Sequence, residues 1–419
     1  MTRARAYAGP RSRRTGRACE RGRGWLRRGP ASGGTPPYRR LLAALFFIGV
    51  ATFAQLYSPQ GLLPLIADDL HVSPDRAALM ISAATLGVAL GVIPWSYVGD
   101  AVGRKQAMLT AIALACLCAA LITVMPGFWW MLALRFVEGL MLGGVPALAV
   151  AYLSEEVSPK VAAIAAGTYV SGTTVGGLAG RIIAAPVGQA VGWELGMLTV
   201  TGLAMICVLV FLRTAPRAQN FTPRVTRLRE AMAALLGNLR SPTLWVIYLQ
   251  GCLTMGGFVA VYNFLGFRLA DPPFSLPIWL VSFIFLAYLA GTVSAPRAGV
   301  LASRFGRKPV LIAGNLTMMA GTALTLVVDL WAIVAGTVIL TVGFFAAHAV
   351  ASGWAGSAAV AGRSQSSSLY NLGYYGGSSL FGFVGGIFLQ LAGWPGTVAM
   401  VLGLGIAATL LAALVLPRN

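Results

Sequence analysis

Charged side chains are scarce in this sequence. Only 10% of its 419 residues are Asp, Glu, Lys or Arg, whereas 57% are hydrophobic and the mean hydropathy is +0.77. A soluble domain carries about 25% charged residues, because its surface has to be polar. The composition therefore places the chain in a lipid bilayer and excludes soluble enzymes, nucleic-acid-binding proteins and disordered proteins.

Histidine and cysteine are also rare, with two and five copies. The cysteines show no metal-ligand spacing, and four of them lie inside apolar runs, as small core residues do. There is no HExxH motif, no P-loop and no Ser/His/Asp set that could converge. We therefore expect no metal, no cofactor, no use of ATP and no enzymatic activity, with a membrane-embedded enzyme or sensor kept as a distant alternative.

Acidic residues are outnumbered 12 to 31 by basic ones, and the formal net charge is +19. Residues 1–40 hold 12 Arg and one acid, Glu20. Because residues 1–38 are rich in Arg, Gly and Pro, we expect a disordered cytoplasmic tail there. This tail either lies on anionic lipid or is merely solvated, and a wrongly included upstream start codon would also explain it. We expect no nucleic-acid partner.

Apolar runs of about 20 residues, long enough to cross the hydrocarbon core as helices, follow one another along the chain. We predict twelve spans, at residues 41–63, 77–98, 107–125, 128–152, 162–188, 194–212, 243–266, 277–298, 309–328, 331–358, 365–391 and 395–416. The polar stretch 213–241 divides them into six and six. The predicted fold class is an all-α membrane protein of two six-helix bundles.

Basic residues in the loops indicate the orientation, since cytoplasmic loops are enriched in Lys and Arg. One side of the predicted bundle carries most of them, including six arginines in residues 213–241. The other side has only Arg76 and Arg268, beside several aspartates. We expect a multi-pass protein of the bacterial inner membrane with both termini in the cytoplasm.

The two halves are related by a repeat at an offset of about 200 residues. Gly-Arg-Lys occurs at residues 103–105 and again at 306–308. The sequence of residues 369–394 also resembles that of residues 168–193. Duplicated bundles are typical of transporters, which bind substrate between their halves. We expect four parts: a tail (1–38), an N-terminal bundle (39–212), a cytoplasmic loop (213–241) and a C-terminal bundle (242–419).

The two loops resemble the signature Gly-x-Leu-x-Asp-Arg-x-Gly-Arg-Lys/Arg of the major facilitator superfamily, and the resemblance extends over residues 41–416. The first loop supplies Asp100, Gly103, Arg104 and Lys105, with Ser96 and Ala101 departing from the signature. The second supplies Gly299, Leu301, Arg304, Gly306, Arg307 and Lys308, with Ser303 in place of the Asp. The resemblance implies the superfamily's fold and a transport function.

The resemblance also implies a gating role for these loops. Asp100 would face the start of the eleventh span, near residues 364–368, and latch the outward-open state. Glu155 and Glu156 are candidate partners of Arg104, and Ser303 predicts a weaker latch in the second half. Alternatively, the basic residues only mark the cytoplasmic side.

Three charged residues fall inside predicted spans. Arg135 and Glu138 are three residues apart and share a helix face, in a second superfamily signature where Glu138 replaces the usual Gln. Arg181 lies at a similar depth in the next span. Buried charges usually line a cavity or a proton path, so we expect Glu138 to titrate under the control of both arginines. The alternative is a static salt bridge between the two spans.

The fifth span is rich in glycine, as in many antiporters of the superfamily, but residues 167–180 lack the Gly-Pro of that signature. The resemblance therefore favours export without establishing it, and close helix packing would also explain the glycines. Residues 368–386 resemble the YnfM-like branch of bacterial drug and metabolite exporters.

Polar and aromatic residues within spans are candidates for the substrate cavity. They are Gln55, Tyr57, Tyr248, Gln250, Asn263, Trp354, Tyr370 and Tyr374, with His348, Asn371 and Tyr375 beside them. Such a lining suits an amphipathic organic molecule, and the arginines leave an anionic substrate open. Packing is the alternative for the aromatic residues and His348.

Together these features predict a secondary active transporter of small organic molecules that exports by proton antiport and alternating access. An importer or uniporter of a nutrient or organic anion is the alternative. The expected partners are the substrate, protons and the lipid bilayer, and we expect a monomer.

Overall fold

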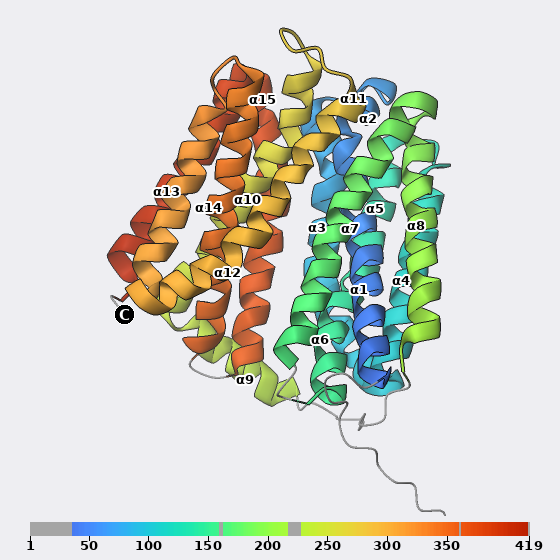
Figure 1. Ribbon diagram of the computed structural model, residues 1–419, viewed down its shortest axis with the longest axis vertical. Helices are drawn as coiled ribbons and strands as arrows, with labels where there is room; N and C mark the ends of the chain where they lie inside the picture. Colours follow the sequence, from blue (N-terminus) through green and yellow to red (C-terminus); the bar gives the residue numbers. More distant parts are fainter. Residues whose placement is uncertain (1–35, 159–161, 217–227, 360–361, 418–419) are drawn as a thin grey trace, which may run out of the picture.

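The computed structural model describes residues 36–158, 162–216, 228–359 and 362–417, and these form helices joined by short turns. Two bundles stand side by side, one of the blue to green helices and one of the yellow to red helices (Figure 1). The expected fold class is confirmed. The first bundle contains α1 (Pro36–Tyr57), η1 (Ser58–Gly61), α2 (Leu63–Asp69), α3 (Pro74–Val102), α4 (Arg104–Ile122), α5 (Phe128–Leu142), α6 (Gly144–Glu156), α7 (Ala162–Val191) and α8 (Trp193–Thr214).

The second bundle repeats this plan. It contains α10 (Pro242–Ala270), α11 (Ile278–Val281), η2 (Ser282–Ala287), α12 (Tyr288–Phe305), α13 (Arg307–Leu324), α14 (Leu330–Ser357) and α15 (Arg363–Val415). In the described residues, nine helical segments are long and apolar enough to cross a membrane. The last of them holds two helices, since the backbone of α15 leaves the helical conformation at Ala392 and Gly393. With α7 and α13, a helical segment occupies each of the twelve predicted spans.

Two segments differ from the predicted boundaries. Helix α1 begins at Pro36, inside the predicted tail, and the rest of that tail lies outside the described residues. Of the predicted central loop, residues 217–227 lie outside the described residues, and α9 (Leu228–Leu239) forms a helix within it. The division into domains at residues 39–212 and 242–419 stays a prediction.

The Gly-Arg-Lys turns have the same structure in both halves. Gly103 and Gly306 have φ values of +95° and +90°, a conformation that favours glycine. After the first turn, the Lys105 ammonium donates to the Ala215 carbonyl 2.6 Å away, just past the end of α8. Lys308 donates in the same way to the Leu416 carbonyl at 2.7 Å, past the end of α15. Each lysine therefore caps the last helix of its own bundle.

We call the end of the molecule with these two turns the basic end, and the opposite end, with Asp69 and Asp75, the acidic end. In Figure 1, α9 marks the basic end, while α2 and α11 lie at the acidic end. Exposed tryptophans lie where helices start at the acidic end: Trp129 and Trp130 on α5, and Trp331 on α14. Tryptophan is typical of the membrane–water interface.

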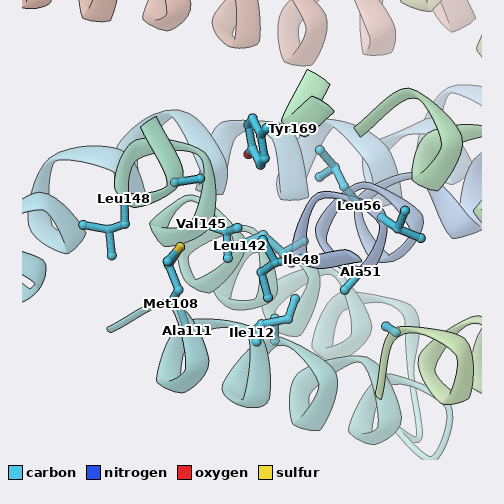
Figure 2. Packing of buried hydrophobic residues seen from close by; sticks show 14 of the residues in the cluster. Ile48, Ala51, Leu56, Met108, Ala111, Ile112, Leu142, Val145, Leu148 and Tyr169 are labelled. Carbon is cyan, nitrogen blue, oxygen red and sulfur yellow. The ribbon is translucent and has the colours of Figure 1, made fainter. Parts of the chain in front are cut away.

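Small residues bring the helices of a bundle close together. Cβ atoms added to Gly172, Gly176 and Gly180 of α7 would lie 2.2 to 2.4 Å from carbonyl oxygens of α1. The glycine-rich fifth span is thus a packing face. Inside the same bundle, apolar side chains such as Ile48 and Leu142 form a continuous core with residues of α4 (Figure 2).

Candidate functional site

The first Gly-Arg-Lys turn holds an ion-pair network. Arg104 lies 2.6 Å from a carboxylate oxygen of Asp100 and 2.9 Å from one of Glu155, so the expected partner Glu155 is found. Both contacts lie within the first bundle. The side chain of Ser364 lies outside the described residues, and the expected latch from Asp100 to residues 364–368 stays a prediction.

The second turn uses neutral partners. Arg307 donates to the Ser357 hydroxyl at 2.6 Å, and its guanidinium lies 5.9 Å from the Trp354 ring centroid. The Ser303 hydroxyl bonds within its own helix. Gly299 and Arg304 are exposed on α12. The two turns therefore differ in charge although their backbones match.

Arg135 and Glu138 of α5 form a salt bridge of 2.7 Å, and both side chains are fully buried. Arg135 also donates to the carbonyl of Met80 in α3 at 2.9 Å and to that of Leu56, near the end of α1, at 2.8 Å. One oxygen of Glu138 has no hydrogen-bond partner. The pair thus links three helices of the first bundle and retains one unpaired carboxylate oxygen.

Arg181 does not join this pair. Its guanidinium donates to the Gln60 side chain at 2.7 Å, to the Gly177 carbonyl at 2.6 Å and to the Tyr288 hydroxyl at 3.3 Å. Because Tyr288 belongs to the second bundle, Arg181 lies at the boundary between the halves. The expected group of three charges is therefore divided, since α5 and α7 present their charged faces to different neighbours.

Gln60 and Asn263 connect the two bundles. The Gln60 amide donates to the Asn263 side-chain oxygen at 2.6 Å, and the two residues are 203 positions apart. That offset equals the spacing of the two Gly-Arg-Lys turns, so equivalent positions of the repeat meet. We singled out Asn263 but missed Gln60, which a search at the repeat offset would have found.

Other contacts join the bundles between mid-depth and the acidic end. The hydroxyl of Thr85 in α3 lies 2.8 Å from that of Ser379 in α15. Nearer the acidic end, the Trp279 backbone donates to Gln189, and Gln390 donates to Asp75. A cavity beside Gln60 has a volume of about 10 Å³, room for about one water molecule. These contacts join the two bundles on the acidic side.

The expected cavity residues separate into two groups. Tyr57, Asn263 and Tyr374 lie near the boundary between the bundles, where Tyr374 packs on His348 with ring centroids 4.9 Å apart. The Tyr370 hydroxyl lies 2.8 Å from His348 Nδ1. Four other candidates contact residues of their own bundle. Gln55 contacts Cys116, Gln250 contacts Ala408 and Asn315, Tyr248 contacts Ser366, and Trp354 contacts Arg307.

Aromatic side chains near Arg181 were not all expected. Its guanidinium carbon lies 4.2 Å from the Tyr57 ring centroid, 4.7 Å from that of Tyr288 and 4.9 Å from that of Phe285. Phe285 belongs to the short segment η2, and Tyr288 is the first residue of α12. No spacing in the sequence indicated that these segments approach α7.

Known proteins are similar to this sequence over most of its length. The family model of the Major Facilitator Superfamily matches residues 45–295 and 274–419. Inner membrane transport protein YnfM of Escherichia coli (strain K12) is 37% identical over 368 residues, which cover 88% of each chain. Uncharacterized MFS-type transporter YybF of Bacillus subtilis (strain 168) is 34% identical, over 88% of this chain and 91% of its own length.

Solved structures share the fold at low sequence identity. The nucleoside transporter NupG superposes with a TM-score of 0.74 at 14% identity, covering 90% of this chain and 100% of its own. A bacterial homolog of the human lysosomal transporter Spinster superposes with a TM-score of 0.72 at 15% identity, covering 91% and 96%. With its repeated turns, paired bundles and these relatives, the chain belongs to the major facilitator superfamily of membrane transporters.

Proposed function

We propose that the chain is a secondary active transporter of the bacterial inner membrane that exports a small organic molecule in exchange for protons. The main support is a continuous chain of contacts from a buried carboxylate to the boundary between the bundles. It runs from Glu138 through Arg135 to the end of α1, and from there through η1 to Gln60 and Asn263.

The end of α1 is the mobile part in this proposal. Helix α1 stops at Tyr57, and η1 follows with Pro59, which lacks an amide hydrogen. Arg135 holds the Leu56 carbonyl just before this break, and Gln60 lies just after it. A change in the hydrogen bonds of Arg135 therefore acts on the segment that contacts the second bundle.

Protonation of Glu138 would make that change. A neutral carboxyl group attracts the Arg135 guanidinium less than a carboxylate does. The Glu138 oxygen that has no hydrogen-bond partner is the one that can take up the proton. Arg135 would then rely on backbone carbonyls alone. In this scheme, proton binding and proton release change how firmly Arg135 holds the end of α1, and through η1 they change the contact between the bundles on the acidic side.

The positive-inside rule supports a cytoplasmic location for the basic end. With that orientation, the acidic side, where the bundles are in contact, faces the periplasm, and we assign the described conformation to the inward-facing state. The ion pair between Asp100 and Arg104 within one bundle fits this state, because the proposed latch of Asp100 onto the other bundle belongs to the outward-open state.

Glu138→Gln tests proton coupling. In everted inner-membrane vesicles that are acidic inside, a substrate of the wild type should be accumulated and should release protons, which acridine orange reports. The amide cannot take up a proton, so we expect Glu138→Gln to abolish this proton release while exchange of labelled substrate without a gradient continues. The starting panel is ethidium, norfloxacin, chloramphenicol, uridine and benzoate.

Glu194→Gln is the matched control, because it makes the same chemical change in the first turn of α8, away from the chain of contacts. It should behave like the wild type. Unchanged proton release in Glu138→Gln would contradict the assignment of Glu138. Uptake by vesicles of the opposite orientation, with none by everted ones, would favour the importer instead.

A further inference from the structure

Arg181 is a buried cation that has no anionic partner among the residues the structure describes. Its side chain is 1% exposed. The salt bridges of the described residues involve Arg104 and Arg135, and none includes Arg181. Buried charges in membrane proteins are usually paired or mark a substrate pathway. Arg135 is paired with Glu138, whereas Arg181 has no such pair and is therefore a candidate for the substrate pathway.

Two N–H groups of Arg181 remain available to a ligand. A guanidinium has five N–H groups, and the acceptors around Arg181 are Gln60, Gly177 and Tyr288. Each contact uses a different nitrogen, which leaves one N–H on each terminal nitrogen. Two such groups are what a carboxylate or phosphate needs for bidentate binding.

Neutral groups surround the charge. The rings of Tyr57, Phe285 and Tyr288 lie within 4.9 Å of the guanidinium carbon and stabilise it as cation–π partners. They do not neutralise it. An uncompensated positive charge in a medium of low polarity attracts anions far more strongly than one in water does.

Two further polar groups near this boundary have no partner in the part of the chain that the structure describes. Asn263 Nδ2 and Ser82 Oγ are buried without a hydrogen bond, and each lies 3.3 Å from the position that a Cβ of Gly382 would occupy. They come from opposite bundles, and Asn263 is joined to Arg181 through Gln60. Unsatisfied donors beside an unpaired cation indicate a site that is completed by an acceptor from a ligand.

We infer that Arg181 binds the negatively charged group of the transported molecule, and that the substrate is therefore an organic anion with an apolar or aromatic body. The inference rests on the proposed transport function and adds the class of substrate. Since Arg181 is enclosed, the anion displaces the Tyr288 hydroxyl, which makes the longest of the three hydrogen bonds at 3.3 Å. The aromatic rings then contact the body of the substrate.

Binding can be tested without a gradient on the purified full-length protein. The probes are 1-naphthoate, 1-naphthamide and 1-naphthylmethylamine, which share one ring system and differ in charge. Unfolding is followed with a thiol-reactive dye, because Cys116, Cys118 and Cys207 are buried and free. We expect the carboxylate to raise the Tm by about 2–4 °C at saturation and the amide and amine to leave it unchanged.

Variants of Arg181 locate the binding site. Arg181→Gln should lose the Tm shift, and Arg181→Lys should retain part of it with weaker binding, because a lysine keeps the charge without the fork. Tyr288→Phe removes the competing hydroxyl and keeps the ring, so the carboxylate should bind about two- to tenfold more tightly. Arg268→Gln is the control, since Arg268 lies over Trp394 at the acidic end.

Three results would overturn the inference: an equal Tm shift with the amide or amine, a full shift in Arg181→Gln, or no shift with benzoate, phenylacetate or 1-naphthoate at about 10 mM. The comparison of the carboxylate, amide and amine probes on the wild-type protein tests the inference even if Arg181→Gln does not fold. If the vesicles transport a neutral or cationic compound as well as they transport a carboxylate, the transport proposal stands and the anion site is contradicted. Carboxylate binding without proton-driven transport would do the reverse.

Discussion

Arg135 and Arg181 look alike in the sequence but have different environments in the structure. Arg135 has an ion pair with Glu138 on its own helix and acceptors in the backbones of α1 and α3. Arg181 has amide, hydroxyl and aromatic neighbours. The first arginine is held within a bundle, whereas the second faces the boundary between the bundles, which is why we assign them to coupling and to substrate binding.

Glycines of α7 provide a prediction at the same scale. Gly176→Ala would place its Cβ 2.3 Å from the Val50 carbonyl oxygen, so α1 and α7 would have to separate. Overpacking of this kind costs about 1–3 kcal/mol. We expect Tm to fall by several degrees in the thiol-dye assay.

Gly167→Ala is the matched control on the same helix, because a Cβ there meets no atom within 4 Å. Alanine has the higher helix propensity, so this variant should be neutral or slightly more stable. If both variants unfold at the wild-type temperature, the close packing of α1 on α7 is contradicted.

At the scale of elements, the short segment η1 has a central position. It follows the break at the end of α1, and Gly61 brings its backbone against α7, where a Cβ would lie 2.8 Å from the Arg181 carbonyl oxygen. Gln60 in this segment contacts both Arg181 and Asn263. Residues of η1 therefore connect the first bundle's charged groups to the second bundle.

Gln60→Leu should weaken the closed acidic side. It removes the hydrogen bond to Asn263 and leaves that amide buried without a partner, so the bundles should separate more often there. We expect a cysteine placed at the buried Ser282, in a background without other cysteines, to react about two- to tenfold faster with an impermeant maleimide from the acidic side.

Thr168→Val controls for this measurement, since the Thr168 hydroxyl is exposed and bonds only to its own helix. Its labelling rate should equal that of the parent protein. A Gln60→Leu rate no higher than this control would show that the link does not hold the acidic side closed.

At the scale of the whole molecule, charge and hydrophobicity are arranged along the membrane normal. The basic end carries both Gly-Arg-Lys turns, exposed apolar side chains cover the flanks, and exposed tryptophans lie at both ends, such as Trp245 at the basic end and Trp331 at the acidic end. This arrangement supports the proposed cytoplasmic location of the basic end.

Reporter fusions test that orientation. Alkaline phosphatase is active only in the periplasm, so a fusion after Asn419 should be inactive while green fluorescent protein at the same place should fluoresce. A phosphatase fusion after Asp271, which follows α10 at the acidic end, should be active. The reverse pattern would exclude the proposed orientation and with it the inward-facing assignment.

The sequence predicted the fold better than the site. Twelve spans and a repeated turn follow from local hydropathy and from an offset that any comparison of the halves detects. Of the candidate cavity residues, Gln55 and Gln250 prove to be buried inside single bundles, and Gln60, Phe285 and Tyr288 were missed. Polarity within a span does not tell which neighbour a side chain faces.

Composition and repetition alone determined the membrane class and the two bundles, because the bilayer requires long apolar helices whatever their partners are. The resemblance of the two Gly-Arg-Lys loops to a known signature indicated the superfamily. The sequence also placed Arg135 and Glu138 on one helix face, but only the tertiary structure decided where Arg181 lies relative to them. Arg135 pairs with Glu138 because they are neighbours on one helix, whereas Arg181 is separated from them by the rotation of α7 and by the break after Tyr57. Those features depend on close packing between distant segments, and within the described part of the chain they leave Arg181 at the boundary between the bundles without an ion pair.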